Sequence, residues 1–137
     1  MLRSAVGVLC LGVMLAGCAA SSAAGLPAAP GTPEARAACL VAGDAAGGSR
    51  APVDAAAPHA ERAAKSSGQW QELADALSDL QRQYTITAAL DPKVKSSITE
   101  LPPVELKTYE DALDQESTDV LTLMRVCGPL VPAATGG

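Results

Sequence analysis

The amino-acid sequence predicts a small all-α protein, a helical bundle of three to four helices with one disulfide bond. Alanine, the residue with the highest helix propensity, accounts for much of an apolar fraction of 48%. Apolar residues recur at helical spacing, and no segment alternates as a half-buried strand does. Phe is absent from the 137 residues. A core this poor in large side chains is expected to need a crosslink.

The N-terminus has the pattern of a secretory signal. Arg3 precedes an apolar run from Ala5 to Ala16, which is shorter than the roughly 20 residues that span a bilayer. The run ends in Leu15-Ala16-Gly17-Cys18, which resembles the lipobox of bacterial lipoproteins at all four positions. The resemblance covers only residues 1–17 and their junction with Cys18. It implies cleavage before Cys18 and a covalent lipid, such as diacylglyceryl and palmitate, on that residue.

Such a lipid implies a protein held on the extracytoplasmic face of the cell membrane, because two or three acyl chains anchor stably. Residues 18–32 are expected to be a lipid-anchored flexible tether, since the stretch is small and rich in Ser, Gly and Pro. The bundle domain is assigned to residues 33–128. Thr32-Pro33-Glu34 predicts the start of its first helix, with a capping hydroxyl, a proline and an acid in the first turn.

The first helix is expected to reach about Ala46 and to end at Gly47-Gly48. Its apolar face is thin and consists of Ala35, Ala38, Cys39 and Ala42. A loop is expected at 47–58. From about His59, a heptad spacing predicts one long helix of about 25–30 residues. The seam of that helix is formed by Ala63, Trp70, Leu77 and Tyr84, with Leu73 and Leu80 at the partner positions.

Asp91-Pro92 predicts a stop, with a short helix from Pro92 to about Glu100. The last helix is expected from about Pro103 to Cys127, before Gly128-Pro129. Its predicted seam comprises Leu106, Leu113, Val120 and Cys127, with Tyr109 and Leu123 beside them. Residues 129–137 are expected to be a loose C-terminal tail.

Two cysteines remain after Cys10 leaves with the signal and Cys18 carries lipid. In an exported domain, Cys39 and Cys127 on apolar helix faces predict one disulfide between the first and last helices. A redox-active pair is the alternative, but a Cys-x-x-Cys spacing is missing.

The sequence offers no set of residues for catalysis or metal binding. His59 is the only histidine and is expected to be a solvated residue at a loop–helix boundary, without a nucleophile or zinc ligands around it. We therefore expect no enzyme, no metal and no cofactor apart from the lipid on Cys18. A formal charge of −5 and the lack of a basic patch argue against nucleic-acid binding.

The carboxylates between Glu105 and Asp119 are expected to form a solvated acidic face. Glu116 is the exception, because it falls on the predicted seam and is expected to pair with a base such as Arg82, reach the edge, or line a polar notch. Trp70, Tyr84 and Tyr109 are expected to fill the core. The alternative is that these three residues, together with Glu116, line a small apolar pocket.

Two functions follow from these patterns. The favoured one is a non-enzymatic interaction module of the cell envelope, anchored to the membrane by its lipid and contacting another envelope protein or the wall. The alternative is a binder or carrier of a small apolar ligand, with the pocket around Trp70, Tyr84, Tyr109 and Glu116.

Overall fold

The computed structural model describes residues 28–43, 48–97 and 100–131. Within these ranges the chain forms four α-helices, a 3-10 turn between the second and third of them, and no strand. The prediction of a small all-α bundle with one disulfide is confirmed. The predicted signal, Cys18 and most of the predicted tether lie outside the described residues. The elements are α1 (Thr32–Ala42), α2 (Arg50–Ser66), η2 (Gly68–Trp70), α3 (Gln71–Ser97) and α4 (Pro103–Cys127).

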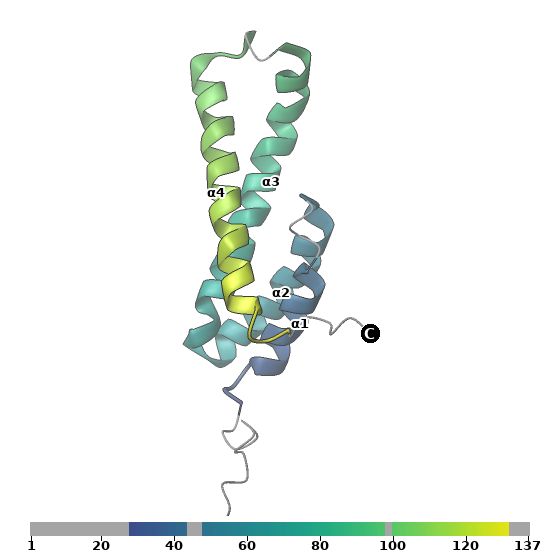
Figure 1. The fold of residues 1–137 in the computed structure, drawn as a ribbon, viewed down its shortest axis with the longest axis vertical. Coiled ribbons are helices and arrows are strands. Elements are labelled where there is room, and N and C mark those ends of the chain that lie inside the picture. The colour runs from purple at the N-terminus through teal and green to yellow at the C-terminus, as the bar shows by residue number, and fades with distance from the viewer. Residues whose placement is uncertain (1–27, 44–47, 98–99, 132–137) are drawn as a thin grey trace, which may run out of the picture.

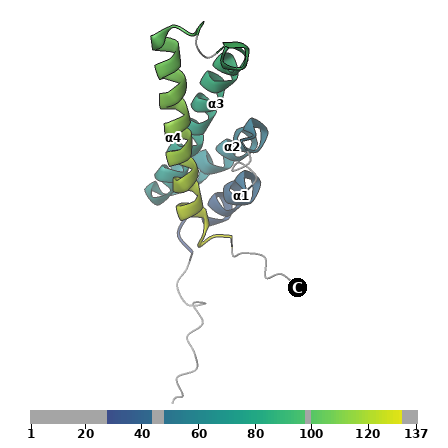
Figure 2. The same ribbon diagram turned by 45° about the horizontal axis from the view of Figure 1, so that its top comes forward.

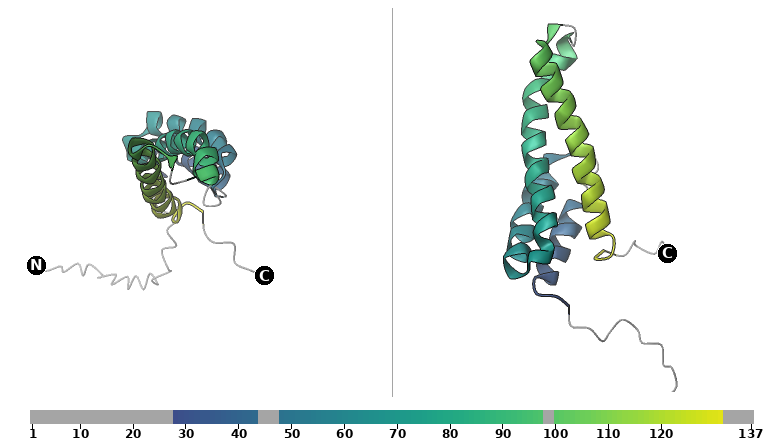
Figure 3. Two further views of the ribbon diagram at one scale, coloured as in Figure 1. Left: turned by 90° about the horizontal axis from the view of Figure 1, so that it is seen from above. Right: turned by 90° about the vertical axis from the view of Figure 1, so that its left-hand side faces the viewer.

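Each helix packs mainly on its neighbour in the chain: α1 on α2, α2 on α3 and α3 on α4 (Figure 1). The helices α3 and α4 form a long antiparallel hairpin, and its far half extends beyond the pair formed by α1 and α2 (Figures 1 and 2). The side view separates the two ends clearly, with the start of α1 at one end and the hairpin tip at the other (Figure 3). The chain therefore enters the bundle far from the tip.

Small side chains form the contact between α1 and α2. Ala35 and Ala38 of α1 and Ala56 and Ala60 of α2 are fully buried, and side chains of this size let two helix axes approach closely. The predicted face of α1 is confirmed, although the helix ends at Ala42 and not at Ala46. The largest fully buried side chains are Val53, Leu73, Leu77 and Leu80.

The predicted loop at 47–58 is wrong from Arg50 onward, because α2 begins there. The prolines and glycines around this segment suggested a loop. Pro52 falls in the first turn, where a proline is tolerated. Pro58 lies inside the helix with an exposed side chain, and burial of the opposite face outweighs its lost hydrogen bond. That face comprises Val53, Ala56, Ala57, Ala60 and Ala63.

The predicted single helix from His59 is two helices. Ser67 is extended, with φ −158° and ψ 130°, and η2 then turns the chain so that α3 packs on α2. All six predicted seam residues are nevertheless buried. The predicted stop at Asp91 is also wrong, because α3 continues through Pro92 to Ser97.

Helix α4 has the predicted bounds, Pro103–Cys127, and Val120, Leu123 and Cys127 of its predicted face lie in or against the core, but in the middle of the helix the buried position moves by one residue. Leu113 of the predicted seam is 41% exposed, whereas its neighbour Ala112 is buried together with Asp119 and Leu123. After α4 the backbone N–H groups of Leu130 and Val131 bond to the Cys127 carbonyl oxygen. Both side chains pack against the core, so the predicted loose tail does not include them.

Candidate functional site

A disulfide joins Cys39 of α1 to Cys127 at the end of α4, as predicted. The two Cα atoms lie 5.4 Å apart, and 88 positions separate the residues in sequence. The bond connects the first and last helices, which otherwise share few contacts. It therefore closes the ring of helices at the end where the chain enters.

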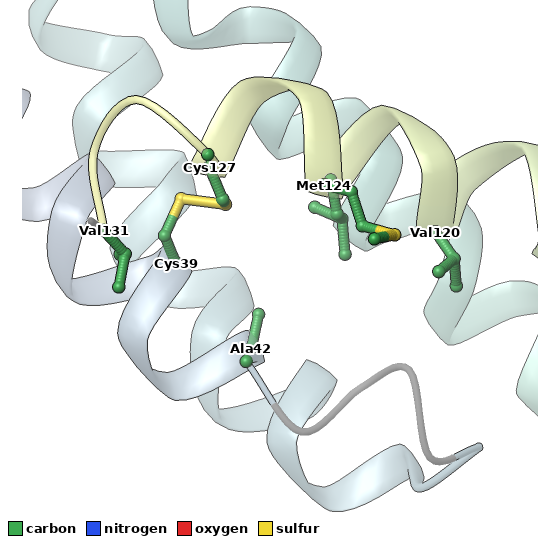
Figure 4. Close-up of a pocket in the computed structure, with 9 residues that line it drawn as sticks. Cys39, Ala42, Val120, Met124, Cys127 and Val131 are labelled. Carbon is green, nitrogen blue, oxygen red and sulfur yellow. A yellow bond between two sulfur atoms is a disulfide. The ribbon is translucent and has the colours of Figure 1, made fainter. Parts of the chain in front are cut away.

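Beside the disulfide, an apolar groove of about 250 Å³ opens between α1 and α4. Figure 4 shows Cys39 and Ala42 on one side and Val120, Met124 and Cys127 on the other. Among the residues that the structure describes, no charged side chain lines the groove, and Met124, which lines it, is 63% exposed. The predictions did not include this groove, because it is formed by side chains of the first and last helices whose packing around the disulfide only the tertiary structure shows.

Three of the four residues predicted to share a pocket do line one recess. Tyr84 of α3 and Tyr109 and Glu116 of α4 border an open depression of about 340 Å³. Trp70 does not belong to it, because 14 residues of helix, about 21 Å, separate Trp70 from Tyr84 along α3. The lining is also more polar than predicted, since it includes Asp91.

The polar groups of this recess are connected. The Tyr109 hydroxyl donates to Asp91 Oδ1 at 3.2 Å, and the Asp91 carboxylate also pairs with Lys95. The hydrogen bond from Lys95 holds the pKa of Asp91 below its ordinary value. Burial raises the pKa of Tyr84, and the negative charge of the neighbouring Glu116 raises it further. Burial also raises the pKa of Glu116.

Of the three placements expected for Glu116, the ion pair with Arg82 is not formed, because Arg82 pairs with Asp79, and Glu116 instead lines the polar recess. The solvated acidic face predicted for α4 has a second exception, Asp119, which is 5% exposed. Its Oδ1 accepts from Gln115 Nε2 at 3.0 Å, and its Oδ2 is buried without a hydrogen-bond partner. The spacing in the sequence could have indicated this burial, since Asp119 lies seven residues after Ala112 and four before Leu123, on the same side of the helix.

His59 lies in the middle of α2 and not at the predicted loop–helix boundary. Its Nδ1 is 2.9 Å from Glu34 Oε2, and Arg62 pairs with the same carboxylate. The hydrogen bonds from His59 and Arg62 lower the pKa of Glu34. These contacts connect α1 to α2 at the surface.

Across residues 28–43, 48–97 and 100–131, no three His, Cys, Asp or Glu side chains are grouped so that they could hold a metal ion. Over the same part of the chain, no helix combines the length and the apolar character needed to cross a membrane. Comparison with known proteins gave no match: no family model, no curated protein and no solved structure is similar to this chain.

Proposed function

We propose that this chain is an exported lipoprotein, held by a lipid on Cys18 at the extracytoplasmic face of the cell membrane, and that its bundle is a non-enzymatic interaction module. The lipobox-like residues Leu15-Ala16-Gly17-Cys18 support the anchor. An intramolecular disulfide suits an exported protein, because such bonds persist in oxidising compartments.

The observation that supports an interaction module is the half of the α3–α4 hairpin that extends beyond α1 and α2. The chain enters the bundle at the opposite end (Figure 1), so the hairpin tip is the part of the bundle farthest from the point where a tether is attached. Val104 near the tip is 77% exposed, and Glu110, Asp111 and Asp114 are exposed on the same helix. Asp111 pairs with Lys107, so Val104, with the exposed carboxylates of Glu110 and Asp114 further along α4, fits a partner surface that carries an apolar side chain with basic residues to one side.

Crosslinking in intact cells tests this proposal. A photoreactive residue replaces Val104, and a matched one replaces Ala55, which is exposed on α2 away from the hairpin. We expect one reproducible protein adduct from position 104, none from position 55, and loss of the adduct in a Cys18→Ala background. Equal labelling from both positions, or an adduct that persists without Cys18, contradicts the proposal.

A second candidate function is the binding of a small apolar ligand, and the groove beside the disulfide favours it. The groove has about 250 Å³ and an apolar lining, so it replaces the predicted pocket around Trp70 as the place for such a ligand. A fluorescent fatty acid titrated into the Cys18→Ala protein tests it. Binding that Met124→Glu abolishes and Leu121→Glu leaves intact supports the groove, because Leu121 is exposed outside its lining. No binding rejects it.

A further inference from the structure

The recess between Tyr84 and Tyr109 combines aromatic rings with carboxylates in one place. Tyr84 and Asp91 come from α3, and Tyr109, Leu113 and Glu116 come from α4. Tyr84 is 5% exposed, whereas Tyr109 and Glu116 are half-buried and remain accessible. The depression of about 340 Å³ is large enough for a small organic molecule, since ligand pockets begin near 300 Å³.

The charged side chains at this recess differ in whether they have a partner of opposite charge. Asp91 already pairs with Lys95. Arg50, the cation that lines the recess, donates from Nε to Asp54 at 3.0 Å and from Nη1 to Thr85 at 3.2 Å. Among the described residues, no basic side chain forms an ion pair with Glu116. The half-buried Glu116 carboxylate is thus the charge at this recess for which the described residues supply no counterion.

We propose that this recess binds a small organic ammonium ion. The ring faces of tyrosines attract a cation and tolerate its alkyl groups, while a carboxylate supplies the opposite charge. Leu113 and Ala88 add apolar contacts on the rim. A small anion is disfavoured by Asp91 and Glu116. This binding site is independent of the module proposed above, which uses the hairpin tip and the lipid on Cys18.

Titration calorimetry of the full chain in non-ionic detergent tests the site. Choline is the probe, and 3,3-dimethyl-1-butanol, its uncharged carbon analogue, is the matched control. We expect choline to bind at a single site and the alcohol to bind at least about tenfold more weakly, since the rings and Glu116 recognise the charge. Equal binding of the two, or no heat from choline up to tens of millimolar, overturns the proposal.

Variants locate the binding site. Glu116→Gln keeps the shape of the side chain and removes its charge, and it is expected to weaken choline binding by about tenfold. Tyr109→Leu removes a ring and is expected to weaken binding by several-fold. Glu110→Gln on the same helix, outside the recess, is the control and should bind as the parent chain does. If Glu110→Gln and Glu116→Gln have equal effects, the site is wrongly placed.

The ammonium group has two chemical sources, a free amine or a lipid headgroup. A parallel titration with glycerophosphocholine distinguishes them. Tighter binding of choline assigns the recess to a free ammonium compound, and tighter binding of glycerophosphocholine assigns it to a headgroup. Thermal unfolding followed by circular dichroism establishes that each variant is folded before binding is compared.

Discussion

The indole Nε1 of Trp70 donates a hydrogen bond of 2.9 Å to the carbonyl oxygen of Pro30, 40 residues earlier in the chain. Trp70 belongs to the turn between α2 and α3, and Pro30 lies just before α1. The bond therefore holds the last residues of the predicted tether against the bundle. In a protein proposed to be attached to a membrane through this tether, the contact fixes where the tether meets the bundle.

A Trp70→Phe substitution keeps an aromatic ring and removes the donor. We expect the free energy of unfolding to fall by about 1–3 kcal/mol, because the Pro30 carbonyl loses its partner and the smaller ring leaves space in the core. Urea unfolding followed by circular dichroism measures it. An unchanged midpoint would show that water replaces the indole at no cost.

The disulfide provides the second prediction. Replacement of both Cys39 and Cys127 by serine is expected to lower the free energy of unfolding by about 4–5 kcal/mol, because the bond closes a long loop in the unfolded chain. The small core makes this loss severe, and α1 and α4 should separate first because they share few other contacts. Urea unfolding of the oxidised and the double-serine chains gives the difference. A loss below about 1 kcal/mol would contradict the entropic account.

The third prediction concerns Gly31, where both the backbone conformation and the lack of space disfavour any side chain. Its φ is +81°, and a Cβ atom at this position would lie 2.7 Å from the Ala63 carbonyl oxygen. We expect Gly31→Ala to destabilise the chain by about 2–3 kcal/mol. Gly48 has a φ of +72° with nothing within 4 Å of a Cβ, so Gly48→Ala isolates the backbone strain and should cost about 1 kcal/mol. Equal losses, measured by thermal unfolding, would show that the clash relaxes.

The buried Asp119 carboxyl is expected to make the free energy of unfolding depend on pH. Burial raises the pKa of its carboxyl, and the nearby Asp79 adds to the rise. A folded pKa above the unfolded one means that the protonated form favours folding. The stabilisation from the protonated Asp119 carboxyl is therefore complete when the pH is below the ordinary pKa of 3.8. It is lost as the pH rises through the pKa of the folded chain.

An Asp119→Asn substitution is thus expected to stabilise the chain at pH 7 by about 1 kcal/mol and to have little effect near pH 3. Urea unfolding at the two pH values measures the difference from the parent chain. Asp114→Asn, on the exposed side of the same helix, is the control and should not show this change with pH. A benefit of Asp119→Asn that is equal at both pH values would mean that charge burial is not its cause.

Local signals predicted most of the helical structure. The bounds of α4 were predicted correctly, because Pro103 and Gly128 are strong start and stop residues and the apolar spacing between them is unbroken. The pairing of Cys39 with Cys127 was predicted by elimination of the other cysteines. Local signals failed at Pro58 and Pro92, since both prolines lie inside helices whose buried faces contribute more than one lost hydrogen bond costs.

By itself, the sequence determined that the chain is helical, that Cys39 and Cys127 are the available pair, and that the core is small. The tertiary structure alone decided where α2 turns into α3, because a heptad pattern continues unchanged across a turn that reverses the chain. It also decided which polar residues are buried. Glu116 and Asp119 are carboxylates three residues apart on the same helix, yet Asp119 is buried and Glu116 borders an open recess. Which carboxylate is buried depends on the rotation of α4 against α3.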